Sequence, residues 1–168
     1  MTGRRFFMSA LALPLIGLGA SWAVTHHGAQ QGTEWDVPIR GYDPRDLLRG
    51  HYITFQYDWP GLTREGDSFA YIDTLCIKGT APAITHASQP TRGSAPQSDC
   101  TAIARASQWD KGSNGLGTGI FYVPQTKAVD YERMLRDSRQ QGVMRVRIRA
   151  DGLVRPISLT FRSSREQR

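Results

Sequence analysis

The residues best suited to acid–base chemistry or cation binding lie in one short segment. Asp43 and Asp46 place two carboxylates three positions apart, beside Arg45, Arg49 and His51. General acid–base catalysis and cation sites both use side chains of these types. The same residues also fit a structural network, in which an aspartate caps a turn and an arginine braces the loop against a strand. We favour the structural interpretation, because two aspartates at this spacing suit a turn as well as a site.

A second group of functional candidates is a row of arginines near the C-terminus. Arg145, Arg147 and Arg149 alternate with apolar residues, so on a β-strand they share one face with roughly 7 Å between neighbours. Such a row can meet an acidic loop of a partner protein or anionic lipid headgroups. The alternative, which we favour, is an ordinary solvated outer face, because sheets with one wet side commonly alternate in this way.

The basic character of the chain is concentrated at its C-terminal end. The net charge is +6, and residues 133–168 carry ten arginines against three acidic residues. A bias of this kind indicates nucleic acid, anionic lipid or an acidic partner, or an arginine-rich surface that serves solubility. Because the features described below point to export, we expect no nucleic-acid partner.

The chain has two cysteines, Cys76 and Cys100. The segment between them is rich in Pro, Ser, Thr, Ala and Gly, a composition typical of a loop. We predict that a disulfide closes this loop in an oxidising compartment and stabilises the fold by roughly 3 kcal/mol. Two unrelated free thiols are the alternative.

Other catalytic and cofactor motifs are absent from the sequence. There is no Gly-x-Ser-x-Gly motif, and the glycines of residues 112–117 have the wrong spacing for a dinucleotide-binding loop. His26 and His27 lack cysteine or carboxylate companions at ligand spacing. We therefore assign neither a metal nor a cofactor.

The N-terminus carries a long uncharged run that predicts a membrane segment. Residues 6–24 contain no charge and follow Arg4 and Arg5, and about 20 apolar residues cross a bilayer. The positive-inside rule then places the N-terminus in the cytoplasm and the rest outside. The leading interpretation is an uncleaved signal anchor, single-pass in the inner (cytoplasmic) membrane. Cleavage after Ala23 and twin-arginine export are the alternatives.

We expect four segments along the chain: a signal anchor or transmembrane helix over residues 1–24, a polar linker over 25–32, an extracytoplasmic domain over 33–162 and a polar tail over 163–168. Period-two alternation predicts strands at 35–39, 51–57, 69–77, 100–109, 120–123, 145–150 and 157–161. The fold class that follows is mainly β (α+β), a compact antiparallel β-rich domain with one amphipathic helix, preceded by the N-terminal helix.

Particular residues predict how the C-terminal elements begin and end. Tyr131, Met134 and Leu135 fall at helical spacing, and Gly142 is a natural stop for that helix. The dipeptide at 151–152, Asp-Gly, predicts a two-residue hairpin turn. Pro156 lacks an N–H and predicts that the last strand lies at an edge of the sheet.

Residues 43–57 resemble a known family. The segment DPRDLLR at 43–49 and the strand GHYITFQY at 50–57 are similar to the GDYXXLXY protein family, named for a Gly-Asp-Tyr…Leu-x-Tyr strand. The FYVP segment at 121–124, the helix and the hairpin also fit, so the resemblance covers about residues 35–161. His51 stands where the family has Asp and Phe55 where it has Leu, which puts any role of a carboxylate at position 51 in question. The motif and candidate binding residues are Asp43, Arg45, Asp46, Arg49, Gly50, His51, Tyr52 and Tyr57.

The resemblance implies a membrane-anchored envelope domain of unknown biochemical activity, often encoded beside polytopic membrane proteins. We therefore expect an envelope-facing accessory or binding module, anchored by residues 6–24, that partners a polytopic membrane protein. An extracytoplasmic enzyme with its site in the loop of residues 43–52 is the less favoured alternative. A free periplasmic protein, released by cleavage, is a third.

Overall fold

The computed structural model describes residues 2–42, 52–62, 71–90, 99–107 and 115–163. The chain divides into two compact units, Met1–Gln31 and Gly32–Arg168. The first unit is a single helix, and the second is a β-rich domain.

The first unit consists of the helix α1, Thr2–Gln30. Residues 25–30, which we expected to form a polar linker, are helical because polar side chains alone do not end a helix. Thr25 Oγ1 donates a hydrogen bond to the Ser21 carbonyl oxygen at 2.8 Å, and the Trp22 and His26 rings stack with their centroids 5.0 Å apart. The helix ends just before Gly32, whose φ of +120° is a conformation that favours glycine.

The expected N-terminal helix is confirmed. In the described part of the chain, no helix combines the length and the apolar character that a membrane span requires.

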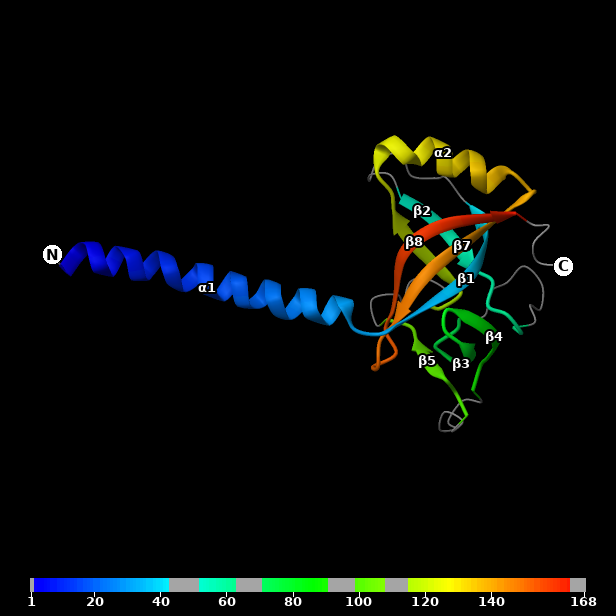
Figure 1. Ribbon diagram of the computed structural model, residues 1–168, viewed down its shortest axis with the longest axis horizontal. Helices are drawn as coiled ribbons and strands as arrows, with labels where there is room; N and C mark the ends of the chain where they lie inside the picture. The colour runs from blue at the N-terminus through cyan, green and yellow to red at the C-terminus, as the bar shows by residue number, and fades with distance from the viewer. Residues whose placement is uncertain (1, 43–51, 63–70, 91–98, 108–114, 164–168) are drawn as a thin grey trace. The chain divides into compact units, whose positions relative to one another are not determined.

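In the described residues the second unit is a mixed half-barrel of eight strands with one short helix. The strands run in the order β5-β3-β4-β1-β2-β6, with β7 paired to β1 and β8 to β7 (Figure 1). The elements are β1 Thr33–Tyr42, β2 Tyr52–Tyr57, β3 Thr74–Thr80, β4 Ala83–Ser88, β5 Ala102–Arg105, β6 Thr118–Tyr122, α2 Gln125–Arg136, β7 Gln140–Ile148 and β8 Val154–Ser163.

Strand β1 connects the parts of the sheet. Its residues 33–38 pair antiparallel with residues 143–148 of β7, and its residues 39–42 pair antiparallel with residues 55–57 of β2. A single parallel pair, Asp36 with Ala83, joins β1 to β4. The sheet is therefore mixed, and the predicted antiparallel arrangement holds for every other strand pair described.

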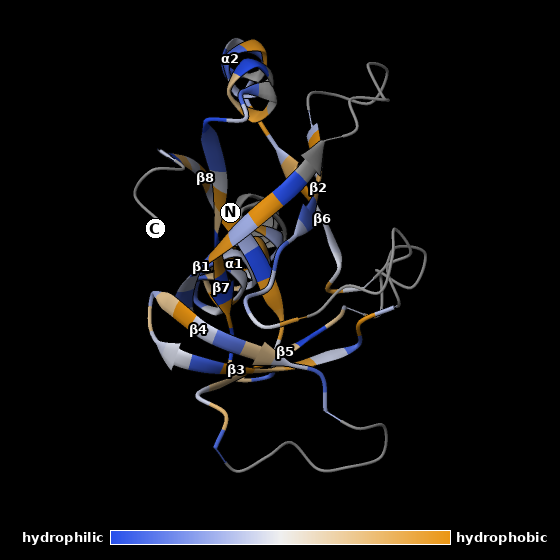
Figure 2. Ribbon diagram, turned by 90° about the vertical axis from the view of Figure 1, so that its right-hand side faces the viewer, coloured by the Kyte–Doolittle hydropathy of each residue, from blue (hydrophilic) through white to orange (hydrophobic). Residues whose placement is uncertain are grey.

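The core follows the alternation that the sequence predicts. Trp35, Val37 and Ile39 of β1 are at most 3% exposed, and every second residue of β2 is likewise buried. Figure 2 shows apolar and polar residues alternating along β1. Beyond β2, the ring of Trp59 packs at a tilt against that of Tyr57, and Trp59 Nε1 donates to the Leu116 carbonyl oxygen at 2.7 Å in the interior. The β-rich core predicted from these strands is confirmed.

The C-terminal hairpin differs from the prediction in its turn. Its loop has three residues, 150–152, rather than two, because Gly152 N–H donates to the Arg149 carbonyl oxygen at 2.9 Å and Gly152 adopts a φ of +90°. A bulge at Ile157 shifts the register of β8, and the side chain is 37% exposed instead of facing the core. In the described residues β8 pairs with β7 alone, so the edge position predicted from Pro156 is confirmed.

Helix α2 packs on the core as predicted but ends earlier. Tyr131 and Leu135 contact the buried cluster, and the helix ends at Arg136, where the following Asp137 is extended. Gly142 is not the stop but a buried residue of β7. A Cβ atom there would lie 2.9 Å from Cγ1 of Ile39, so the glycine permits close packing between the strand and the core.

We expect Gly119→Ala to destabilise the domain. Gly119 in β6 pairs with Phe55, and an added Cβ would lie 2.6 Å from Phe55 Cζ and 3.0 Å from Tyr57 Cε2. Because Phe55 is only 1% exposed, its ring has no free space to move into, and overpacking of this kind costs about 1–3 kcal/mol. Urea unfolding measures the loss. Gly28→Ala, where nothing lies within 4 Å, is the matched control, and equal midpoints for the two variants would contradict the packing described.

Candidate functional site

Most of the motif residues predicted from the sequence fall outside the described residues. These are Asp43, Arg45, Asp46, Arg49, Gly50 and His51, and their proposed roles stay predictions. Tyr52 and Tyr57 stand at the two ends of β2. Tyr57 is buried in the core at 5% exposure, whereas Tyr52 lies on the opposite, outer side of the strand. The structure therefore does not bring these two tyrosines together.

Tyr52 borders an exposed apolar surface. It pairs with Tyr122 of β6, and the two rings lie 6.1 Å apart with a tilt of 58°. Ile120, paired with Thr54, is 52% exposed and Tyr122 is 73% exposed. We call Tyr52, Thr54, Ile120 and Tyr122 the β2–β6 outer face. The sequence signal for it was the alternation in the FYVP segment, where Phe121 packs on the core and Tyr122 points outward.

Arg145 and Arg147 lie on one face of β7 as predicted, Arg149 follows the strand, and every member of the row contacts a carboxylate. Arg145 Nε and Nη2 donate to the two carboxylate oxygens of Asp36 at 2.8 and 3.2 Å. Arg147 donates to Glu34, its direct neighbour across the strands. Arg149 Nη2 lies 2.9 Å from Oδ2 of Asp151. Much of the positive charge of the row is therefore balanced within the chain.

Asp36 is a carboxylate that pairs with arginines from two strands. Arg162 of β8 donates to it as well, and its side chain is only 9% exposed. The hydrogen bond from Arg145 lowers the pKa of Asp36; burial opposes this, and the charge of Arg145 and the contact with Arg162 support it. The pKa of Arg145 is raised in turn by its hydrogen bond to Asp36. Asp36, Glu34 and Arg162 are not among the site residues predicted from the sequence, although alternation with Trp35 places both acids on the outer face.

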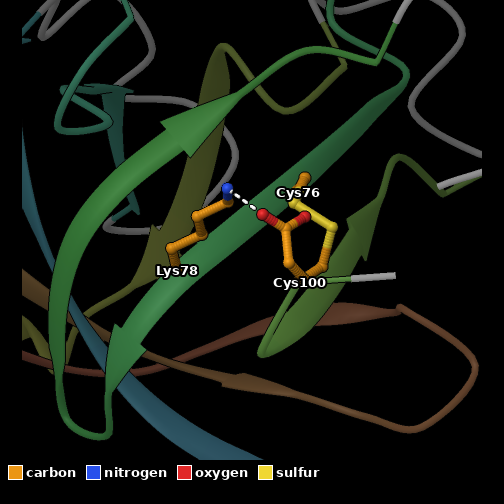
Figure 3. The surroundings of a disulfide bond; sticks show 4 residues. Cys76, Lys78 and Cys100 are labelled. Carbon is orange, nitrogen blue, oxygen red and sulfur yellow. Dashed lines mark hydrogen bonds and ion pairs between the residues drawn. A yellow bond between two sulfur atoms is a disulfide. The ribbon is translucent and has the colours of Figure 1, made fainter. Parts of the chain in front are cut away.

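The predicted disulfide between Cys76 and Cys100 is confirmed. Cys76 lies in β3, Cys100 precedes β5, and their Cα atoms are 5.3 Å apart. Beside the bond, Lys78 donates a hydrogen bond to Asp99, which lowers the pKa of that carboxyl (Figure 3). The segment enclosed by the disulfide contains strand β4 and is not a loop throughout.

The same region brings together the donor atoms of Cys76, Asp99 and Cys100, which all lie within 4.8 Å of one another. Metals are bound by the thiolate form of cysteine. Because the two sulfur atoms are joined in the disulfide, this cluster is not suited to hold a metal ion.

A family model described as GDYXXLXY protein matches residues 14–159 of the chain. The matched span contains the β2–β6 outer face, the arginine row and both cysteines. No curated protein and no solved structure matches the chain.

Replacing Asp36 by asparagine should lower both the stability of the domain and its dependence on pH. Loss of charge-assisted hydrogen bonds to partly exposed arginines is expected to cost about 1–2 kcal/mol at neutral pH. A carboxyl whose pKa is lower in the folded chain stabilises the fold above its unfolded value of about 4. That contribution disappears as the pH falls through the folded pKa.

Chemical unfolding of wild type and Asp36→Asn between pH 3 and pH 7 measures this effect. We expect the two stabilities to converge as the solution becomes acidic. Asp130→Asn on α2, whose carboxylate is exposed and 3.7 Å from Arg133, is the control and should change stability at neutral pH by less than about 0.5 kcal/mol. A constant gap at all pH values would contradict the assigned role of Asp36.

Removal of the disulfide should destabilise the domain without abolishing its fold. The bond closes a segment with a sequence separation of 24, so Cys76→Ala with Cys100→Ala is expected to cost roughly 3 kcal/mol. Thermal unfolding measures the loss, and wild type in reductant should move to the stability of the double variant. Identical unfolding of oxidised wild type and the double variant would show that the bond contributes nothing.

Proposed function

The chain belongs to the GDYXXLXY protein family, and from this premise we propose that it is a membrane-anchored, envelope-facing accessory module that binds a polytopic membrane protein. The N-terminal segment holds the chain at the membrane. The β-rich domain carries the contact surface for the partner.

The observation that carries the proposal is the exposed apolar surface of α1. In the described part of α1, six large apolar side chains are 61–77% exposed, and they are Leu13, Leu15, Ile16, Leu18, Trp22 and Val24. Apolar surface gathered in one element marks contact with a membrane or with another protein. Arg4 and Arg5 precede this segment, so the positive-inside rule keeps the N-terminus in the cytoplasm and the domain outside. The proposed location is therefore the inner membrane, where residues 6–24 hold the chain.

The disulfide supports the same orientation. Disulfides persist in oxidising compartments and are rare in the cytosol of ordinary cells. A domain that joins Cys76 to Cys100 is consistent with a position on the outer side of the membrane.

Binding is favoured over catalysis by the state of the described carboxylates. Asp36 and Glu34 are held by arginines of β7, and the lowered pKa of Asp36 makes it a weak base at neutral pH. The β2–β6 outer face, in contrast, presents an exposed tyrosine and isoleucine. Interfaces are enriched in aromatic residues, which supply large contact areas. We assign the contact with the membrane-protein partner to this face.

Site-specific photo-crosslinking in the native membrane tests the assignment. A photoreactive residue in place of Tyr122 in the full chain is expected to crosslink to one membrane protein. The same residue in place of Ile157, an exposed apolar position on β8, is the matched control and should give no such product.

Two results would contradict the proposal. Equal products from positions 122 and 157 would show that the β2–β6 outer face has no special role. Absence of any protein product at 122, while the chain stays in the membrane fraction, would refute the partner and leave only the anchor.

A further inference from the structure

Arginines from β5, β7 and β8 gather around the loop that joins β7 to β8. Arg149 precedes this loop and Arg155 follows it. Arg105 of β5 reaches the loop as well, because its N–H donates to the Gly152 carbonyl oxygen at 2.8 Å and its Cγ lies 2.8 Å from where a Cβ of Gly152 would be. Arg147 lies directly across from Arg155. We call Arg105, Arg147, Arg149 and Arg155 the basic tip.

The basic tip carries more positive charge than its neighbours balance. Glu34 pairs with Arg147 and Asp151 with Arg149. Arg105 and Arg155 are exposed, and within the described part of the chain neither contacts a carboxylate. Among the described residues, two positive charges at this end of the domain therefore have no carboxylate beside them.

The pairing of Arg147 with Arg155 is itself unfavourable. Like charges directly opposite each other on neighbouring strands destabilise a sheet, and the Glu34 carboxylate contacts Arg147 and not Arg155. An external anion placed between these side chains would remove the repulsion. Guanidinium groups match phosphate oxygens in geometry and in charge.

The basic tip lies beside the residue at which the domain begins. Thr33 pairs with Ile148, and a Cβ on Gly32 would lie 2.5 Å from the Ile148 carbonyl oxygen and 3.0 Å from Arg149 Cα. Figure 1 shows the start of β1 and the β7–β8 loop at the same end of the domain. The end of the domain that carries the basic tip is therefore the end that follows, along the chain, directly on the residues before Gly32.

We propose that the basic tip binds the anionic phospholipid headgroups of the membrane in which the chain is anchored. The proposal rests on the anchoring proposed above and adds a second, electrostatic contact that orients the domain. Each arginine near an anionic surface strengthens binding by about fivefold, so loss of two should weaken the contact by about 25-fold. Salt should weaken the contact with the headgroups as well, because dissolved ions screen exposed charges such as those of Arg105 and Arg155.

Hydrogen exchange of the loop amides in the full chain on lipid vesicles tests the proposal. On vesicles with about 30% phosphatidylglycerol, residues 149–155 are expected to exchange more slowly than on pure phosphatidylcholine vesicles. The double variant Arg105→Gln, Arg155→Gln should exchange at the phosphatidylcholine rate on both. It removes no ion pair of the described residues, so the fold is expected to persist, and the exchange of β1 amides checks this.

A matched double variant removes the same charge elsewhere. Arg133→Gln with Arg139→Gln changes side chains that are 77% and 88% exposed at and after α2, and β7 separates them from the loop. This variant should keep the protection seen in wild type. The proposal would be overturned if residues 149–155 of the wild type exchanged equally fast on the two vesicle types. It would also be overturned if both double variants lost the protection of these residues to the same extent.

Two further outcomes separate this inference from the proposed function. Release of the full chain from pure phosphatidylcholine vesicles would refute the anchor, whereas retention there without protection on anionic vesicles would refute only the basic tip. Protection in native membranes that is absent on anionic vesicles would assign the tip to an acidic protein and overturn the lipid contact.

Discussion

The pairing of β1 with β7 is the interaction on which the rest of the domain depends. Along β1, Glu34 and Asp36 alternate with Trp35 and Val37, so the same register buries the apolar side chains and sets the two acids opposite Arg147 and Arg145. A shift of one residue would move every side chain to the other face. It would bury the carboxylates and expose the core in a single step. The core and the outer ion pairs therefore specify the same register of β1 against β7. Strands β2 and β4 then pair with β1 and take their positions from it.

Alternation along single strands could be predicted, because the period of two is a local property of the chain. This holds for the buried faces of β1 and β2 and for the common face of Arg145 and Arg147. The pair of Asp36 with Arg145 could not be predicted, since the two residues are 109 positions apart and only the strand order joins them. Gly142 was misplaced for a related reason. Its role depends on contact with Ile39 across the sheet, whereas the sequence around it resembles a helix end.

The named motif of the family has two physical roles in the described residues. Tyr57 lies in the core beside Phe55, with the rings 4.9 Å apart at nearly a right angle. A phenylalanine in place of the family's leucine is accommodated there opposite Gly119, so this half of the motif is explained by packing. Tyr52, on the outer side, contacts Tyr122, so core packing does not determine its side chain. The candidate surfaces for binding are therefore on the outside of a core that the motif builds.

Membrane fractionation combined with the intact mass of the native protein tests the central claim, an anchored and disulfide-bonded module, most directly. We predict a full-length species that resists carbonate extraction and has a mass two hydrogen atoms below that of the reduced chain. A soluble species that begins near Val24 would contradict it, because the anchor would then be absent from the mature protein.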